Sequence, residues 1–416
     1  MNSSSILWQN KAKTVVLLDL PRSIEEAQYL SDKQVLPGPE FTNLTTSFRR
    51  LISSPAPEHP FLTPEPKSSG HAQSAASPAS QIAELMTIAS VESALENIRG
   101  SYQGPWCLPR ITSQSASPDE LDRTSKPIKE VEGLPIPPPK TTPIPKNPKS
   151  PPKLTGEPVT ITPSQVNNPD RPNKPTTPSF YIPPHSHTLT GPFSPPPPPN
   201  QKFNLILLDP PWPNRSAKRK RSGHGTYTPL SSVSTTSQLL CSFPIASLLS
   251  PDNGGGLVAV WVTNSTRHRD LLLDPKTGIF AKNWGVELIG EWIWLKATSN
   301  GEPIVDLESQ WRKPYERLLI ARKKAGVVDV QGNGKGKGGM KTKVIVSVPD
   351  IHSRKPNLKR LFEEEEEEGG LLLPTGYMAL EMFARNLTAG WWAWGDEAAK
   401  FQRREFWVEE GNKGES

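Results

Sequence analysis

The sequence is poor in cysteine and in long apolar runs. Two cysteines occur among its 416 residues, Cys107 and Cys241, and neither has a cysteine or histidine neighbour at the spacing of a metal site. A disulfide framework and a structural zinc site are therefore not expected, and no metal is predicted. No stretch approaches the ~18 apolar residues that span a bilayer, and we expect no signal peptide. These absences favour a soluble intracellular protein in a reducing compartment.

Hydrophobic residues are also scarce, at 34%, whereas proline is abundant, with 48 residues. That proline share is about twice the average of ~5%. Such a chain cannot bury enough surface throughout its length to offset the entropy of ordering it. We therefore expect a compact domain over residues 179–410, a Pro-rich disordered linker over 111–178, a flexible insertion at 324–341 and a short tail at 411–416.

Residues 1–110 are predicted to form an accessory region with ordered islands at 5–31 and 80–110. In the first island, a β-branched and leucine-rich run predicts a strand that Pro21 ends, and Ser23 resembles the start of a helix with a capping box. In the second island, apolar residues recur at helical spacing. Both islands are therefore expected to be ordered.

The main domain alternates short, almost continuously apolar strand segments with helical segments. Strands are expected at 203–208, 256–262, 286–296, 315–321, 343–348, 377–383 and 391–394, and helices at 264–282, 354–363 and 396–403. Apolar strands that alternate with helices are typical of a mainly parallel sheet that is covered on both faces. The predicted fold class is therefore α/β.

The segment NLILLDPPW, residues 204–212, ends an apolar strand at an aspartate, two prolines and a tryptophan. Ligands of open α/β sheets bind beyond the carboxyl ends of the strands, which places Asp209 where chemistry occurs. Pro210 and Pro211 fix the backbone and remove two N–H donors, so this corner offers hydrogen-bond acceptors only. An acceptor corner suits an exocyclic amine, and Trp212 supplies a flat face on which a base could stack.

These parts suit methylation of an adenine amine. The amine is a poor nucleophile because its lone pair is delocalised into the ring. The carboxylate of Asp209 and the carbonyl of Pro210 can hold its two protons and favour a pyramidal nitrogen, whose lone pair then faces an electrophilic methyl group. The alternative interpretation is a strand-ending turn with a packed tryptophan.

A polar and cationic loop follows the acceptor corner in a chain whose net charge is +6. The residues predicted to contact the substrate here are Asn214, Arg215, Lys218, Arg219, Lys220, Arg221 and Tyr227. Cations beside an aromatic residue suit a phosphate backbone. The run KRKR is also typical of a nuclear-localisation signal, so we expect a nuclear protein, with the cytoplasm as a second location. The two roles are compatible.

Several further blocks resemble one known family. DPPW is similar to the catalytic motif of the adenosine-N(6) methyltransferases, the group of the messenger-RNA adenosine methyltransferase catalytic subunit. The blocks WVTNSTRH (261–268), KPYERLLIARK (313–323) and LEMFARNLTAGWWAWGDEAAKF (380–401) look like the branch called methyltransferase-like protein four. The N-terminal islands resemble the accessory region of fungal members. The resemblance implies a permuted Rossmann-like fold that uses S-adenosylmethionine, with the catalytic motif before the cofactor-binding motif.

The resemblance also implies roles for particular residues. The side chains implied to bind S-adenosylmethionine are Lys355, Arg385, Asn386, Asp396 and Glu397. Cations suit the carboxylate of the cofactor, and Asn, Asp or Glu suit its ribose hydroxyls. Relatives usually carry Asn where this chain has Asp396, so the chain departs from the family pattern at this position. Glu291 and Lys296 are implied to lie near the substrate, whereas the tryptophans around them are expected to pack in the core and His268 to lie at the surface.

The sequence therefore predicts an S-adenosylmethionine-dependent methyltransferase that acts on the N(6) amine of adenine in nucleic acid. By resemblance the substrate is RNA, with 2′-O-methyladenosine in a small nuclear RNA as the specific expectation and adenine in DNA as the rival. Two alternatives belong to other classes: a non-catalytic nucleic-acid-binding scaffold and a methyltransferase of protein amides. We expect a monomer, with a heterodimer as the alternative, and no membrane association.

Overall fold

The computed structural model describes part of the chain. The described residues are 4–34, 49–62, 78–112, 180–189, 197, 200–213, 232–251, 256–309, 312–323, 340–351, 354–364 and 373–409. The predicted Pro-rich linker beyond residue 112, the cationic loop after Pro213 and most of the insertion predicted at 324–341 lie outside these ranges. Those three predictions therefore remain predictions.

The described residues form thirteen strands, one long helix and several short helices. The strands are β1 Ile6–Gln9, β2 Val15–Leu18, β3 Arg49–Ser53, β4 Ile111–Thr112, β5 His187–Leu189, β6 Leu205–Leu208, β7 Leu257–Val262, β8 Val286–Lys296, β9 Tyr315–Lys323, β10 Lys341–Ser347, β11 Ala379–Met382, β12 Trp391–Trp394 and β13 Trp407–Glu409. The α-helices are α1 Leu20–Glu26, α2 Pro78–Ser101, α5 Val233–Ser242, α6 Ile245–Leu248, α7 Thr266–Leu273 and α8 Lys359–Glu363. A π-helical turn, η2, spans Phe280–Trp284, and 3-10 turns span η3 Lys400–Gln402 and η4 Arg404–Phe406.

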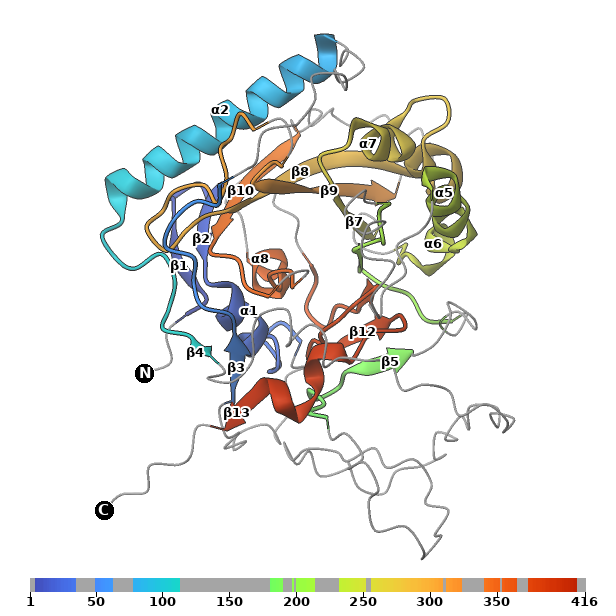
Figure 1. The fold of residues 1–416 in the computed structure, drawn as a ribbon. Coiled ribbons are helices and arrows are strands. Elements are labelled where there is room, and N and C mark those ends of the chain that lie inside the picture. The colour runs from blue at the N-terminus through green and yellow to red at the C-terminus, as the bar shows by residue number, and fades with distance from the viewer. Residues whose placement is uncertain are drawn as a thin grey trace, which may run out of the picture.

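One 10-stranded sheet dominates the structure, with the strand order β1-β2-β10-β8-β9-β7-β6-β11-β12-β5 (Figure 1). Within this sheet, β1 and β9 run antiparallel to their neighbours, and the other pairs are parallel. The parallel strands therefore end at one edge of the sheet, which we call the carboxyl edge. The prediction of a mainly parallel α/β fold is confirmed.

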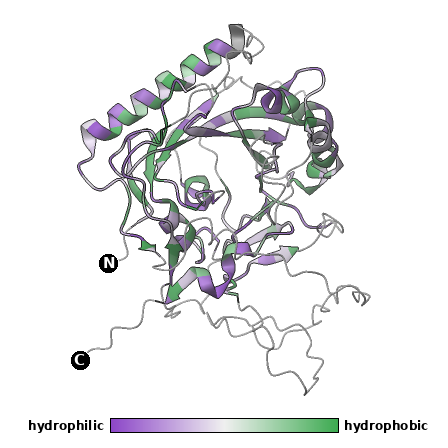
Figure 2. Ribbon diagram, viewed as in Figure 1, coloured by the Kyte–Doolittle hydropathy of each residue, from purple (hydrophilic) through white to green (hydrophobic). Residues whose placement is uncertain are grey.

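Helices cover the sheet on both faces because successive strand residues point to opposite sides. On β6, Leu205 and Leu207 pack with α1 and α8, whereas Ile206 and Leu208 pack with α5, α6 and α7. All four leucine and isoleucine side chains are buried. Figure 2 shows hydrophobic residues along the strands, while α2 carries both hydrophilic and hydrophobic residues along its length. The apolar run of β6 thus fills the interior between two helical layers.

The N-terminal region shares this core. β2 pairs in parallel with β10, with Val15–Leu17 opposite Val344–Val346. α2 lies along the sheet beside β2 and β10 (Figure 1), and its buried apolar residues pack in one cluster with Leu17, Leu295 and Val346. β3 pairs with β13 near the other end of the chain. Residues on both sides of the predicted boundary at 110 therefore belong to one sheet and one interior.

The start of α1 differs from the prediction. The helix begins at Leu20, and the side chain of Asp19 caps it by accepting a hydrogen bond from the backbone N–H of Arg22 at 2.9 Å. Pro21 lies in the first turn, where its missing N–H needs no partner. The predicted capping box at Ser23 is therefore wrong, and the Ser23 hydroxyl instead donates to the carbonyl of Leu20 at 2.6 Å.

The helices of the main domain are shorter than predicted. The segment expected at 264–282 divides into α7 and the turn η2, while 354–363 is helical only in α8 and 396–403 contains only the 3-10 turn η3. The helices α5 and α6 were not predicted, because half of the residues of α5 are Ser or Thr and α6 is only 4 residues long. Ser232 caps α5 through its side chain, a signal that the sequence did carry.

Two classes of site are not found among the described residues. None of their helices is both long and apolar enough to cross a membrane. The described side chains also contain no group of three His, Cys, Asp or Glu residues that could hold a metal ion.

Leu17→Ala tests whether the N-terminal region belongs to the main core. The Leu17 side chain is fully buried between α2 and the sheet, so its truncation should lower the free energy of unfolding by about 2–5 kcal/mol. The control is Leu62→Ala, at a side chain that is 98% exposed, which should change it by less than about 0.5 kcal/mol. Urea denaturation of the full chain measures both. Equal, small effects of the two substitutions would contradict a shared core.

Candidate active site at the carboxyl edge of the sheet

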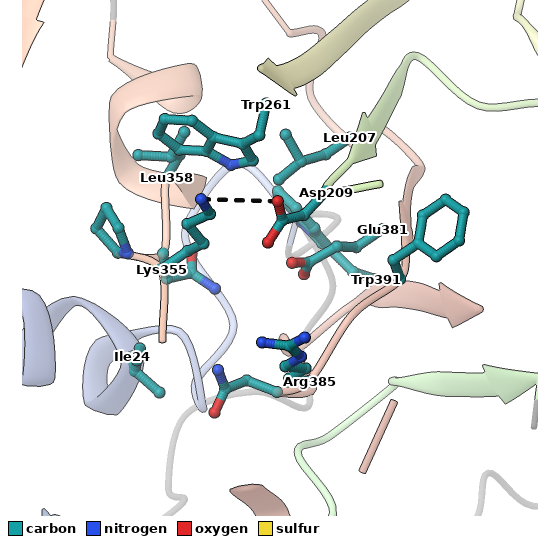
Figure 3. A pocket seen from close by; sticks show the side chains of 13 residues that line it. Ile24, Leu207, Asp209, Trp261, Lys355, Leu358, Glu381, Arg385 and Trp391 are labelled. Atoms are coloured by element: carbon teal, nitrogen blue, oxygen red, sulfur yellow. Dashed lines mark ion pairs between the residues drawn. The ribbon is translucent and has the colours of Figure 1, made fainter. Parts of the chain in front are cut away.

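Asp209 follows β6 directly, and its side chain lines a pocket at the carboxyl edge (Figure 3). The pocket is narrow and partly open to solvent. Its polar lining consists of Asp209, Lys355, Asn357, Glu381, Arg385 and Asn386. Because β6, β7 and β11 are parallel neighbours, the loops that follow them meet at this edge. The sheet therefore gathers charged side chains from distant parts of the sequence.

The apolar wall of the pocket comes from five separate parts of the chain. Leu207 and Trp261 lie on β6 and β7, Leu358 precedes α8, and Trp391 starts β12. Ile24 of α1 completes the wall, so the N-terminal region contributes directly to the pocket. A largely apolar cleft with a few convergent polar groups is the usual form of a small-molecule site.

A chain of alternating charges runs along one side of the pocket. The Lys355 ammonium lies 3.6 Å from Asp209 Oδ1 (Figure 3) and donates a hydrogen bond to Glu316 Oε2. The other Glu316 oxygen accepts from Lys296 Nζ at 2.6 Å. Glu316 is near the start of β9, and because β9 is antiparallel its first residues lie where neighbouring strands end. The four residues thus form one network, which we call the Asp209–Lys296 network.

The pKa values follow from burial and from these neighbours. Burial raises the pKa of Asp209, and the positive charges of Lys355 and Arg385 offset this only in part. Burial also acts to raise the pKa of Glu316, but Lys296 and Lys355 outweigh it and hold that pKa well below its usual range. For Lys355 burial acts to lower the pKa, and the two carboxylates outweigh it, so the pKa is raised. The network therefore keeps Lys355 and Glu316 charged.

Glu381 is a pocket residue that the sequence analysis did not single out. It lies on β11, beside β6, and its carboxyl group faces the pocket together with that of Asp209 (Figure 3). Burial, together with the charge of Asp209, raises the pKa of Glu381 to about 8. At neutral pH the protonated form therefore predominates, and this carboxyl can donate a hydrogen bond beside the acceptor Asp209.

Three of the five residues implied to bind the cofactor meet in the pocket: Lys355, Arg385 and Asn386. The chain reaches the last two through Phe383, which adopts a left-handed conformation (φ 62°) just after β11. Glu397 lies beside them, 3.0 Å from Arg385 Nε, whereas Asp396 is exposed and does not line the pocket. The sequence implied these residues together, and the structure separates Asp396 from the rest.

The donor set fits S-adenosylmethionine. Two cations, Lys355 and Arg385, match the carboxylate of an amino acid. The side-chain oxygen of Asn386 is buried and has no hydrogen-bond partner among the described residues. An unpartnered buried oxygen is costly unless a ligand hydroxyl or amine donates to it, so it suits the polar part of this cofactor.

The prolines of the acceptor corner are buried, and the corner is closed by a tight turn. The Pro210 carbonyl accepts a hydrogen bond from the backbone N–H of Trp212 at 2.8 Å, which leaves its second lone pair. The side chain of Asp209 stays 26% exposed, so it is not sealed inside the protein. The carboxylate is therefore the freer of the two acceptors that the sequence predicted here.

Trp212 does not have the base-stacking position predicted for it. The residue is 7% exposed, its Nε1 donates to the Trp261 carbonyl at 2.7 Å, and its ring stacks on His268 with centroids 4.6 Å apart. His268 is itself 5% exposed, so the prediction of a surface histidine is wrong. Burial against α7 stabilises the indole in this position, a contact that the sequence does not show. The Trp212 side chain therefore packs under the acceptor corner and not in the pocket.

The residues predicted on the substrate side separate into three groups. Lys296 belongs to the Asp209–Lys296 network. Glu291 lies earlier on β8 and is not among the pocket-lining residues; its carboxylate accepts from Arg269 at 2.8 Å and from Arg317 at 3.1 Å. The predicted substrate contacts that fall outside the described residues are Asn214, Arg215, Lys218, Arg219, Lys220, Arg221 and Tyr227.

The tryptophans of the main domain mostly pack in the interior, as predicted. Those that are at most 2% exposed are Trp261, Trp284, Trp292, Trp294, Trp391 and Trp394. Trp261 and Trp391 nevertheless each present part of a side chain to the pocket. They form part of its apolar wall while remaining core residues.

A mainly parallel sheet with an acceptor corner and a pocket of mixed charge at its carboxyl edge is the arrangement of a Rossmann-like methyltransferase that uses S-adenosylmethionine. Residues 203–397 match the MT-A70 family. The chain is 41% identical to the N6-methyladenosine RNA methyltransferase MTA1 of Pyricularia oryzae over 423 aligned residues, which cover 98% of this chain and 97% of that protein. The chain therefore belongs to the MT-A70 family of adenine-N6 methyltransferases.

More distant relatives match half of the chain or less. The N(6)-adenine-specific methyltransferase METTL4 of Mus musculus is 35% identical over 209 residues, 50% of this chain and 40% of that protein. A DNA N6-methyl methyltransferase of Caenorhabditis elegans is 33% identical over 192 residues, 44% of this chain and 42% of that protein. The family resemblance stated from the sequence, including its fungal and METTL4-like character, is confirmed.

His268 should make the protein less stable in mild acid. Burial lowers its pKa from 6.5 to about 4, so between these pH values the unfolded chain binds a proton that the folded chain does not. The free energy of unfolding should therefore decrease as the pH falls from about 6.5 to 4. His268→Phe keeps an aromatic ring against Trp212 but cannot titrate.

Urea denaturation at pH 7, 5.5 and 4.5 measures this effect. The midpoint of the wild-type chain should fall more steeply with pH than that of the His268→Phe variant. Parallel curves for the two proteins would show that His268 does not titrate between the folded and unfolded states as described.

Proposed function

We propose that this chain methylates the N6 amine of adenosine in RNA, and more specifically of 2′-O-methyladenosine in a small nuclear RNA. The observation that carries the proposal is the placement of Asp209. Its partly exposed carboxylate follows β6 at the carboxyl edge and faces a pocket that also holds Lys355 and Arg385. Similarity over nearly the full length to a fungal N6-methyladenosine RNA methyltransferase supports RNA as the substrate.

Some pocket residues would bind the cofactor, and others would bind the base. When bound, S-adenosylmethionine supplies an electrophilic methyl group. Lys355 and Arg385 would hold its carboxylate, and Asn386 would hold a hydroxyl group. Glu397 does not line the pocket but pairs with Arg385 beside it, and it would hold another hydroxyl group. The apolar side chains of the wall, Leu207 and Trp261 among them, exclude water from this end of the pocket.

Asp209 acts on the amine. Its carboxylate accepts a hydrogen bond from one amine proton and so orients the nitrogen lone pair toward the pocket. Lys355 and Arg385 favour the ionised form of Asp209, which an acceptor must have, while burial opposes it. A carboxylate whose pKa is raised is also well suited to take up the proton that the amine loses when it is alkylated.

Glu381 supplies a complementary group. With a pKa raised to about 8, it carries a proton at neutral pH and can donate to an acceptor atom, whereas Asp209 beside it can only accept when ionised. A donor and an acceptor side by side match the edge of adenine that carries the amine and its neighbouring ring nitrogen. This arrangement favours adenine over a base with the reverse pattern.

Adenine in DNA is the second candidate substrate, because a nematode relative is named a DNA N6-methyl methyltransferase. A non-catalytic scaffold is disfavoured because the acceptor corner and the pocket are both intact. The predicted contacts of the cationic loop with phosphate groups, and the nuclear location that its KRKR run suggests, remain part of the proposal. We also propose a monomer, since the N-terminal region packs on the main domain within one chain.

Asp209→Asn should abolish most activity without loss of cofactor binding. The amide keeps the shape of the side chain but replaces one acceptor oxygen with a donor, so kcat should fall by about 10²–10³-fold, as it does when one preorganised polar contact is lost elsewhere. Transfer of labelled methyl groups to an adenosine-containing RNA oligonucleotide measures kcat, and calorimetry measures the cofactor dissociation constant.

The matched control is Glu308→Gln, at an exposed carboxylate that does not line the pocket. It should leave kcat and the dissociation constant unchanged. If Asp209→Asn retained full activity, the acceptor role would have to be abandoned.

The substrate is tested by comparing nucleic acids of one sequence. The three substrates are RNA with 2′-O-methyladenosine, unmodified RNA and DNA. We expect kcat/KM to be highest for the 2′-O-methylated RNA, intermediate for unmodified RNA and lowest for DNA. Mass spectrometry of nucleosides from RNA and DNA of cells lacking the protein identifies the natural target. A loss of N6-methyladenine from DNA alone would refute the RNA proposal while leaving adenine methylation intact.

A further inference from the structure

The segment that carries Lys355 leaves β10 and crosses to the pocket. Its described residues include Val348, Pro349 and Asp350 near the strand and Arg354 next to Lys355. Asp350 and Arg354 are fully buried at their side chains and pair with each other. The position of the Lys355 backbone thus depends on what holds these neighbours.

Arg110, at the end of the N-terminal region, holds the first part of this segment. Its Nη1 donates to the Pro349 carbonyl at 2.9 Å and to the Ser54 carbonyl at 3.1 Å, and its Nη2 donates to the Val348 carbonyl at 2.9 Å. The planar fork of one guanidinium therefore binds two successive carbonyls just after β10. A lysine could not bind both in this geometry.

Asp350 joins the same segment to the region after β3. Its Oδ1 accepts from the Ser54 backbone N–H at 2.7 Å and from the Ser54 hydroxyl at 3.1 Å. Arg354, which bonds the other oxygen of Asp350, also donates to the Ile52 carbonyl at 3.1 Å. Burial acts to raise the pKa of Asp350, but Arg354 and Arg110 outweigh it and hold that pKa below its usual range. Asp350 is therefore ionised and fully engaged.

The N-terminal region holds a second loop at the same edge. Two hydrogen bonds reach the loop after Lys296, each 2.8 Å long. The backbone N–H of Phe61 donates to the Ile304 carbonyl, and Arg99 Nη2 donates to the Gly301 carbonyl. Gly301 has a φ of 81° and packs against Trp106, where a Cβ atom would meet the indole ring. Residues 52–110 thus restrain the segment that carries Lys355 and the loop that directly follows Lys296, the last residue of β8.

We infer that Arg110 and Asp350 are positioning residues that fix the Lys355 backbone in the pocket and so set the affinity for S-adenosylmethionine. This inference rests on the role proposed above for Lys355. Neither residue lines the pocket, so each acts through the segment that it holds. The N-terminal region would then supply, within one chain, the rigid support that the cofactor site requires.

Arg110→Ala tests the inference, because Arg110 is only partly buried and its loss leaves no unpaired buried charge of its own. In the full chain, calorimetry should show the dissociation constant for S-adenosylmethionine raised about tenfold, the loss expected for one charge-assisted hydrogen bond. KM for the RNA oligonucleotide should not change. Hydrogen exchange without cofactor should show faster exchange over residues 348–356 in the variant.

Two controls separate positioning from stability. Leu17→Ala destabilises the same region without touching Arg110 or Asp350, so among folded molecules its dissociation constant should equal that of the wild type. Arg110→Lys restores the charge and one of the carbonyl contacts, so its dissociation constant should lie between those of wild type and Arg110→Ala. If Arg110→Ala folds poorly, Arg110→Lys still tests the inference.

Unchanged cofactor affinity and unchanged exchange in both Arg110 variants would overturn the inference. The same would follow if Leu17→Ala weakened cofactor binding as much as Arg110→Ala does. Because the readout is cofactor binding, a wild-type protein that binds S-adenosylmethionine but does not methylate RNA would refute the proposed substrate and still test the role of Arg110.

Discussion

A lysine held between two carboxylates is the interaction on which the site depends. Lys355 comes from the segment after β10, Asp209 from the end of β6 and Glu316 from the start of β9. Buried charges are costly unless opposite charges lie close, and here the signs alternate through to Lys296. These four charged side chains meet only in the observed order of the strands. The charge pairs of the site therefore depend on the topology of the sheet.

Much of the sheet could be predicted because most of its strands contain runs of consecutive apolar residues. The bounds predicted for β8 and β12 agree with the structure, and Asp209 was placed correctly because a charged residue after a buried strand marks the carboxyl edge. Glu316 could not be placed, since nothing in the local pattern of β9 reveals that this strand runs the other way. Trp212 was misjudged for a related reason: a sequence does not show which residue covers an indole ring.

The N-terminal region illustrates a limit of a different kind. Its helix α2 and strand β2 were expected to be ordered, but their partners lie hundreds of residues away, on β10 and β8. The apolar pattern of a segment shows which of its faces is buried, but it does not show which distant segment covers that face. The similarity to the Pyricularia protein along nearly the entire chain agrees with a core that includes this region, whereas the murine relative matches about half of the chain.

The pairing of β2 with β10 also has a consequence for biosynthesis. One of the first strands to leave the ribosome finds its parallel neighbour only after more than three hundred further residues have been made. At about 5–20 residues per second, that delay is on the order of tens of seconds. During this delay the apolar side of α2 has no complete sheet to pack on. The nascent chain is therefore prone to aggregation until translation is nearly complete. Binding to a chaperone during this interval would favour the correct fold.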